Sequence, residues 1–173
     1  METGLVNNTI PTAYRQLVLS SKAFVNEDWI PSIYTCDGLN VNPSISIGKI
    51  PAETKSLAII MEDPDVKGGS FCHWVTWNLP VTNYIMENEG RGAQGINDFK
   101  RNHYYGPCPL KGIEHYVFRV FALDVILNMP LFAGRKELEK AMEGHIVATG
   151  EITGKYKRVD FIGHVHRLKQ QAK

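Results

Sequence analysis

Cysteine is scarce in this sequence, and none of its cysteines has the spacing of a metal site. Cys36, Cys72 and Cys108 are the three present, and the chain has no CxxC pair, which argues against a structural zinc site. An odd number of cysteines, in a chain that we expect to be cytoplasmic, favours free thiols. His73 follows Cys72, but neighbouring residues on a strand point to opposite faces, so a catalytic cysteine–histidine pair is a poor hypothesis. We predict neither a bound metal nor a cofactor.

Long hydrophobic runs and a strong charge of one sign are also missing. No apolar stretch approaches the ~20 residues that are needed to cross a bilayer. The first stretch, METGLVNNTIPTAYRQ, has neither the basic start nor the hydrophobic segment of a secretory signal. The formal net charge of +1 argues against a nucleic-acid binder, which would usually carry a basic patch. We expect a cytoplasmic protein with no transmembrane segment and no nucleic-acid partner.

The length and the hydrophobic content fit one domain. The chain has 173 residues, of which 43% are hydrophobic. A domain of about 150 residues buries about two-thirds of its surface, which is enough for a substantial core. We predict a single domain over residues 1–173.

Residues 56–79 form the most informative stretch of the chain. The apolar run SLAIIME is typical of a strand buried on both faces, although its period also permits a buried helical turn. Asp63 and Asp65 follow, with Pro64 between them, and a glycine-rich turn leads to the alternating run HWVTWNL. A hairpin of this kind would bring His73 near the two carboxylates. The cluster predicts a functional site, but ordinary turn chemistry with a packed histidine explains the same residues about equally well.

The second informative stretch is HYYGPCPLKGIEHYVFRVFALD at 103–124. Its last ten residues place apolar side chains on both faces, which is typical of a strand inside a sandwich rather than at a wet edge. Before them, Gly106, Pro107, Cys108 and Pro109 form a rigid loop. The backbone amides of its glycine and cysteine suit an oxygen-rich ligand. The same pattern is equally consistent with the plain end of one strand and the start of another.

Two further segments carry weaker signals. The polar, glycine-rich stretch 83–102 predicts a long surface loop, a kind of segment that is often functional or mobile in compact domains. One helix is predicted near 136–144, with Gly144 as its C-cap and an ion pair between Arg135 and Glu139.

Strand character is also expected in two further stretches, at 44–50 and at 145–158. SISIGKI alternates like a half-buried strand. HIVATGEITGKYKR returns to strand character, with turns expected at Gly150 and Gly154. The basic stretch at 161–173 is expected to be a tail, either helical or frayed.

Four motifs in this order resemble the phosphatidylethanolamine-binding protein family, which includes the Raf kinase inhibitor proteins. They are MEDPDV, FCHWVTWNLP, INDFKRNHYYGPCP and HYVFRVFALD, and the chain is most similar to the compact prokaryotic branch of the family. The resemblance extends over residues 24–158. It implies an all-β fold, a β-sandwich of two antiparallel sheets with a few short helices. It also implies a small pocket at one end that takes an anion such as a phosphate or a phospholipid head group.

The resemblance implies a set of pocket residues, and the pattern of the loop at 106–109 adds Cys108 to that set. They comprise an acidic pair, an aromatic wall, an imidazole, a backbone-donor loop, two residues before the last pocket strand, and a tyrosine hydroxyl. In chain order they are Asp63, Asp65, Phe71, His73, Gly106, Pro107, Cys108, Glu114, His115 and Tyr116. Asp63 is expected to orient His73 or to accept a hydrogen bond from an ammonium group.

The chain departs from the family pattern just before the pocket tyrosine. The family usually carries His-Arg there, and this chain has Glu114 and His115. A carboxylate at this position would repel a phosphate dianion, unless His115 enters the pocket in its place. The sequence leaves both arrangements open.

Two classes of function follow from these residues. The first, which we favour, is a non-enzymatic module that binds a small anion or a phosphorylated ligand and regulates or inhibits a protein kinase or a serine protease. The alternative is a metal-assisted or acid–base hydrolase that uses Asp63, Asp65, His73 and Glu114. A homodimer is a weaker expectation, because apolar residues in 83–102 suit an interface.

Overall fold

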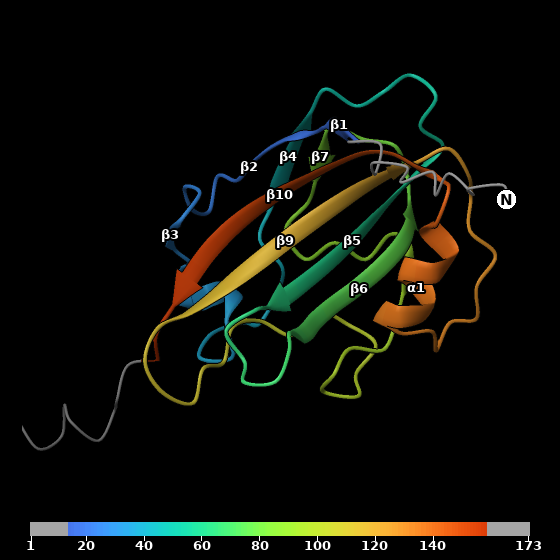
Figure 1. Cartoon of the computed structure of the whole chain (residues 1–173). Helices are drawn as coiled ribbons and strands as arrows, with labels where there is room; N and C mark the ends of the chain where they lie inside the picture. The colour runs from blue at the N-terminus through green and yellow to red at the C-terminus, as the bar shows by residue number, and fades with distance from the viewer. Residues whose placement is uncertain (1–13, 159–173) are drawn as a thin grey trace, which may run out of the picture.

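The computed structural model describes residues 14–158, which form two β-sheets packed face to face and one α-helix (Figure 1). The large sheet contains, in spatial order, β1 (Arg15–Gln16), β10 (Ile146–Tyr156), β9 (Glu114–Leu123), β5 (Ser56–Asp63), β6 (Phe71–Leu79) and β8 (Ala93–Gln94), and β3 (Asp28–Trp29) also pairs with β10. The small sheet contains β2 (Val18–Ser20), β4 (Ile45–Gly48) and β7 (Tyr84–Ile85). The helix α1 spans Arg135–Met142, and a 3-10 turn, η1, spans Ser32–Tyr34.

The predicted all-β sandwich with few helices is confirmed. The central pairs β10–β9, β9–β5 and β5–β6 are antiparallel, as are both pairs of the small sheet. The edge strands β1 and β3 are the departure from a purely antiparallel pattern, because both pair with β10 in parallel. The end of β5 and the beginnings of β6 and β9 therefore lie together at one end of the large sheet (Figure 1).

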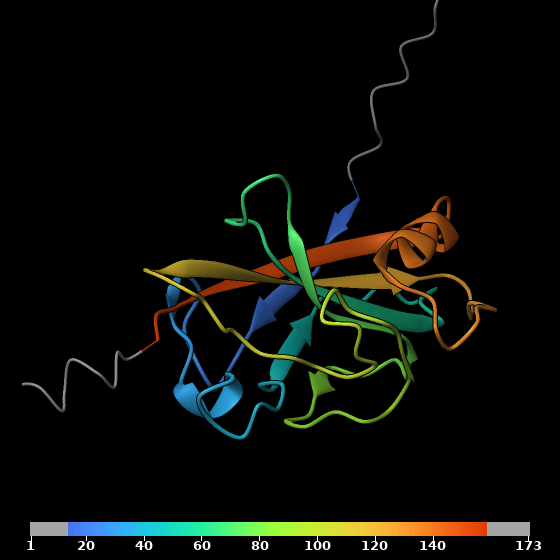
Figure 2. The ribbon, with the colours of Figure 1, turned by 90° about the horizontal axis from the view of Figure 1, so that it is seen from below.

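Strand β5 is buried along its whole length because the large sheet is covered on both faces. Leu57, Ile59 and Met61 point into the core between the two sheets. Ala58 and Ile60 point to the other face, into a second core that α1 covers. Figure 2 shows α1 and the small sheet on opposite sides of the large sheet. The prediction of a strand buried on both faces is confirmed, and the helical alternative is wrong.

The turns expected at Gly150 and Gly154 are absent, because β10 continues through both residues. Each glycine instead lies where another segment packs closely against the strand. A Cβ on Gly150 would lie 2.7 Å from the Leu17 carbonyl oxygen, and one on Gly154 would lie 2.4 Å from the Ile30 side chain. Glycine inside a strand often marks such a close approach rather than a turn.

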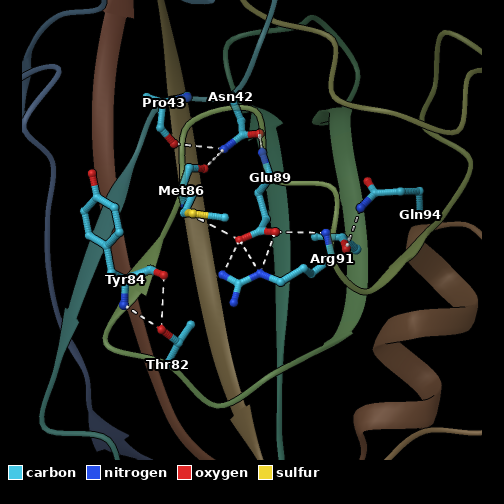
Figure 3. Close-up of polar contacts among 9 residues, drawn as sticks. Asn42, Pro43, Thr82, Tyr84, Met86, Glu89, Arg91 and Gln94 are labelled. Carbon is cyan, nitrogen blue, oxygen red and sulfur yellow. Dashed lines mark hydrogen bonds and ion pairs between the residues drawn. The ribbon is translucent and has the colours of Figure 1, made fainter.

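The stretch 83–102 is polar, as predicted, but it is not one long loop, because it contains β7 and β8. A charge pair between the buried Glu89 and the exposed Arg91 organises it (Figure 3). The Glu89 side chain has no exposed surface, and its Oε2 atom lies 2.6 Å from Nη2 of Arg91. The backbone amide of Glu89 donates to the Asn42 side-chain oxygen at 2.8 Å, and the Asn42 amide nitrogen donates to the Met86 carbonyl at 2.9 Å. These bonds tie the stretch to the segment before β4.

The predicted helix is confirmed as α1. The backbone amide of Gly134 donates to the Glu137 carboxylate at 3.0 Å, which caps the first turn. Gly144 has a positive φ of 78°, as expected after a helix end, and Arg135 pairs with Glu139 at 2.7 Å. Within residues 14–158, no helix is long and apolar enough to cross a membrane. The expected tail at 161–173 lies outside the described residues.

Candidate functional site

A β-bulge places the imidazole of His73. The predicted hairpin of β5 and β6 is confirmed, but its register is irregular: Cys72 pairs with Glu62, and Trp74 pairs with Met61. Two steps along β6 thus match one step along β5, and His73 is the extra residue. Bulges redirect side chains and are frequent beside functional sites. His73 is 3% exposed, and its imidazole meets the ring of Tyr116 edge-on, with the ring centroids 5.2 Å apart.

A backbone carbonyl, rather than Asp63, orients His73. Its Nδ1 atom lies 2.7 Å from the Tyr105 carbonyl oxygen. Because a carbonyl only accepts hydrogen bonds, Nδ1 carries the proton, and in the neutral ring Nε2 keeps its lone pair. Burial lowers the pKa of His73, which favours the neutral ring at pH 7. The expectation that Asp63 orients His73 is therefore wrong.

The carboxyl groups of Asp63 and Glu114 lie together on neighbouring strands. Asp63 is 2% exposed, and its Oδ1 accepts a hydrogen bond of 2.8 Å from the Asp65 amide. Burial, together with the charge of Glu114 and a hydrogen bond to it, raises the pKa of Asp63 to about 7. The Tyr116 hydroxyl donates to Oε2 of Glu114 at 3.1 Å. The site thus contains two carboxyl groups that compete for a proton.

The structure decides which residue before Tyr116 enters the site. Glu114 does, because it alternates with Tyr116 on β9 and points to the same face. His115 points away, and both its ring nitrogen Nδ1 and its backbone amide lie 2.8 Å from Oδ2 of Asp65. Asp65 and His115 form a half-exposed pair outside the site, so the predicted acidic pair is split.

Aromatic rings line one side of the site. Phe71 was predicted, and its ring centroid lies 5.6 Å from that of His73. Phe99 completes the wall, with its centroid 4.8 Å from that of Phe71 and 4.2 Å from that of Tyr105. The sequence prediction missed Phe99 and Tyr105. Both stand in the motif INDFKRNHYYGPCP, where only the GPCP part had been considered.

The sequence suggested that the backbone amide of Gly106 is free to bind a ligand, but in the structure this amide already has a partner. It donates to the side-chain oxygen of Asn40 at 2.7 Å. Glycine is required at 106 for another reason: a Cβ there would lie 2.1 Å from the Tyr34 carbonyl oxygen. Asn40 was missed, and its φ of 59° belongs to the left-handed region, which asparagine tolerates better than most residues.

The prediction of free thiols is wrong for two of the three cysteines. Cys36 and Cys108 form a disulfide with their Cα atoms 5.4 Å apart. The Cys36 amide also donates to the Pro107 carbonyl at 3.1 Å. Cys72 is a free thiol, buried in the core under α1, and burial raises the pKa of its thiol to about 12. The pairing joins residues 72 positions apart, so only the tertiary structure shows it.

The side chains of the site offer mainly hydrogen-bond acceptors. These are the two carboxyl groups, Nε2 of His73 and the oxygen of Tyr116, whose proton is already donated to Glu114. Within residues 14–158, no group of three or more His, Cys, Asp or Glu side chains is arranged to hold a metal ion. The arrangement suits a ligand that brings hydrogen-bond donors and a positive charge.

Comparison with known proteins places this chain in one family. The family model for phosphatidylethanolamine-binding protein matches residues 20–157. UPF0098 proteins of Pyrococcus horikoshii and Pyrococcus abyssi are each 45% identical to this chain, over 80% and 83% of its length and over 75% and 86% of their own.

Solved structures agree with that match. A putative phosphatidylethanolamine-binding protein homolog from Chlamydia trachomatis superposes with a TM-score of 0.80 and 36% identity, over 84% of this chain and 99% of that one. YbcL of E. coli superposes with a TM-score of 0.75 and 27% identity, over 83% of this chain and 99% of that one. The chain belongs to the phosphatidylethanolamine-binding protein family.

Proposed function

We propose that the protein is a binding module whose site holds the ammonium group of a small ligand, such as a head group that carries an amine. The observation that supports it is the contact between the buried Asp63 carboxyl and the carboxyl of Glu114. Because the pKa of Asp63 is raised to about 7, its carboxyl group is about half protonated at neutral pH, and the site carries a net negative charge. An ammonium group would neutralise that charge and lie close to the aromatic wall, whose ring faces attract cations.

The charges of the site favour an amine over the phosphate that the sequence predicted. A phosphate needs donors, but the Gly106 amide is bonded to Asn40, the Cys108 amide to the Tyr116 phenol oxygen, and the Tyr116 hydroxyl to Glu114. Two like charges about 4 Å apart repel by about 4 kcal/mol at the effective dielectric near a protein surface. A ligand with both groups, such as phosphoethanolamine, would therefore point its ammonium inward and its phosphate outward.

Isothermal titration calorimetry with two probes tests the proposal. Ethanolamine should bind, and Glu114→Gln should weaken its binding about tenfold, or about 1.4 kcal/mol. Glu143→Gln, which changes an exposed carboxylate at the end of α1, is the matched control and should leave the affinity unchanged. Ethanolamine should also displace the shared proton, so its affinity should rise between pH 6 and pH 8.

Inorganic phosphate is the competing probe. If phosphate binds at the site and ethanolamine does not, the site is the anion pocket that the sequence predicted, and the amine proposal is wrong. Glu114→Gln would then strengthen phosphate binding, because it removes a repelling charge.

The hydrolase alternative has less support than the binding module. Asp65 lies outside the site, paired with His115, so the four residues named for that chemistry do not gather around one point. Cys72, the one free thiol between residues 14 and 158, lies in the core under α1. A kinase or protease partner, a homodimer and a cytoplasmic location stay predictions.

A further inference from the structure

We propose that the Cys36–Cys108 disulfide is a redox-sensitive clamp that holds the 104–109 loop against His73. The disulfide joins the turn after η1 to the loop that leads into β9. The loop contributes the carbonyl of Tyr105, which fixes the proton and the orientation of the His73 ring. A change in how firmly the loop is held would therefore reach the site directly.

The two joined segments fit closely but have few other links. The Gly106 amide donates to Asn40, the Cys36 amide donates to the Pro107 carbonyl, and the Tyr104 hydroxyl donates to the Tyr34 carbonyl at 2.8 Å. Hydrogen bonds of this kind each contribute little net stability and open transiently. The disulfide is the only covalent link between the segments in the described part of the chain. Without it, we expect the loop to stay docked most of the time but to open more often.

A reductant acts on this disulfide alone among the three cysteines, because Cys72 is already a free thiol. Cys36 and Cys108 are half-buried at the surface, whereas Cys72 is buried in the core under α1. Burial of Cys72 therefore keeps its thiol from exchanging with the cystine.

The reductant is a dithiol, and the step balances as thiol–disulfide exchange. One thiolate of the dithiol attacks a sulfur of the cystine, the S–S bond breaks, and the other cysteine leaves as a thiolate that takes up a proton. The second thiol of the reductant resolves the mixed disulfide, so the cystine becomes two thiols and the dithiol becomes a disulfide. Two electrons and two protons move from the dithiol to the protein.

Amide hydrogen exchange on the full chain, oxidised and after treatment with dithiothreitol, tests the clamp without any ligand. Reduction should speed exchange of the Gly106 and Cys36 amides at least tenfold. Exchange in the middle of β5, at Ala58–Ile60, should stay unchanged, which separates local opening from loss of global stability. The pKa of His73 should rise toward its ordinary value in the reduced protein, because an opening loop exposes the imidazole. Both readouts are independent of the proposed amine ligand.

Variants and thiol labelling complete the test. Cys72→Ala should respond to dithiothreitol like the wild type, and the double variant Cys36→Ser, Cys108→Ser should resemble the reduced protein without responding. Maleimide should label two cysteines after reduction and none before. The clamp proposal fails if dithiothreitol leaves both cysteines unlabelled under native conditions. It also fails if reduction is complete and neither amide exchange nor the His73 titration changes, a comparison that needs only the wild type.

The ligand consequence rests on the proposed function. Reduction should weaken ethanolamine binding several-fold if the site holds an amine. If exchange and the His73 titration respond but ethanolamine does not bind in either state, the clamp stands and the proposed function fails.

Discussion

The carboxyl groups of Asp63 and Glu114 lie against each other where the end of β5 meets the beginning of β9. Burial and this contact raise the pKa of Asp63 to about 7 from its ordinary value of 3.8. The phenol of Tyr116 donates a hydrogen bond to Glu114, which holds one member of the pair in place. The contact makes Asp63 a weaker acid than an isolated carboxyl group would be.

The pKa of Asp63 should be measurable by NMR and should fall in Glu114→Gln. The variant removes the charge that raises the pKa of Asp63, although burial will keep it above 3.8. Glu143→Gln should leave the Asp63 titration unchanged. An Asp63 pKa near 4 in the wild type would contradict the contact.

The same shift predicts how stability depends on pH. A carboxyl whose pKa is raised in the folded state stabilises that state fully below 3.8, and the contribution is lost as pH rises through about 7. Urea unfolding should therefore show that Glu114→Gln gains stability relative to wild type at pH 8, on the order of 1 kcal/mol, since one pKa unit is about 1.4 kcal/mol. At pH 4 the gain should disappear, and an equal gain at both pH values would contradict the assignment.

Asn40→Gly should destabilise the protein because it removes the acceptor of the Gly106 amide. Glycine tolerates the positive φ at position 40, so backbone strain does not contribute. We expect a loss of about 1–3 kcal/mol, the range for a buried donor without its partner. Asn40→Asp keeps an acceptor oxygen and should lose less than Asn40→Gly in the same unfolding measurement. Equal losses would mean that the bond to Gly106 does not matter.

Gly106→Ala should be among the most damaging small changes near the site. The added Cβ would lie 2.1 Å from the backbone oxygen of Tyr34, which cannot move aside like a flexible side chain. We expect a loss of about 3 kcal/mol or more in the free energy of unfolding. Gly90→Ala is the control, because a Cβ there has no atom within 4 Å, and it should change stability by about 0.5 kcal/mol or less. A fully stable Gly106→Ala would show that the loop does not pack on Tyr34.

Arg91→Met should weaken the 83–102 stretch more than its exposed position suggests. It removes the partner of a carboxylate that has no exposed surface, and an unpaired buried charge is costly. The hydrogen bond to Arg91 lowers the pKa of Glu89, so the pair stabilises the protein above pH 4.5 and loses that effect as the pH falls through the folded pKa of Glu89. The urea midpoint should therefore drop in Arg91→Met at pH 7, and the difference from wild type should shrink at acid pH. A pH-independent difference would indicate lost packing instead.

The long strands β4, β5, β6, β9 and β10 and most of the side chains at the site could be predicted from the sequence, whereas the short strands β1, β2, β7 and β8 could not. Apolar runs such as the one at 56–62, and alternation in β4, depend on local spacing, which a single chain displays directly. The family motifs brought Asp63, Phe71, His73 and Tyr116 to one end of the sandwich, and the structure places them there. Gly144 and the Arg135–Glu139 pair were also predictable, because helix caps and i,i+4 pairs are local.

Tertiary structure alone decided which groups bond to one another at the site. The bulge at His73 depends on how β5 and β6 pair. The bond from His73 to Tyr105 joins residues 32 positions apart, and the bond from Gly106 to Asn40 joins residues 66 positions apart. No local pattern in the sequence encodes such contacts. Cys36 and Cys108 were misjudged for the same reason, because pairing depends on where the chain returns and not on the spacing of cysteines. Gly150 and Gly154 looked like turns because a sequence shows a missing side chain but not the neighbour that fills its space.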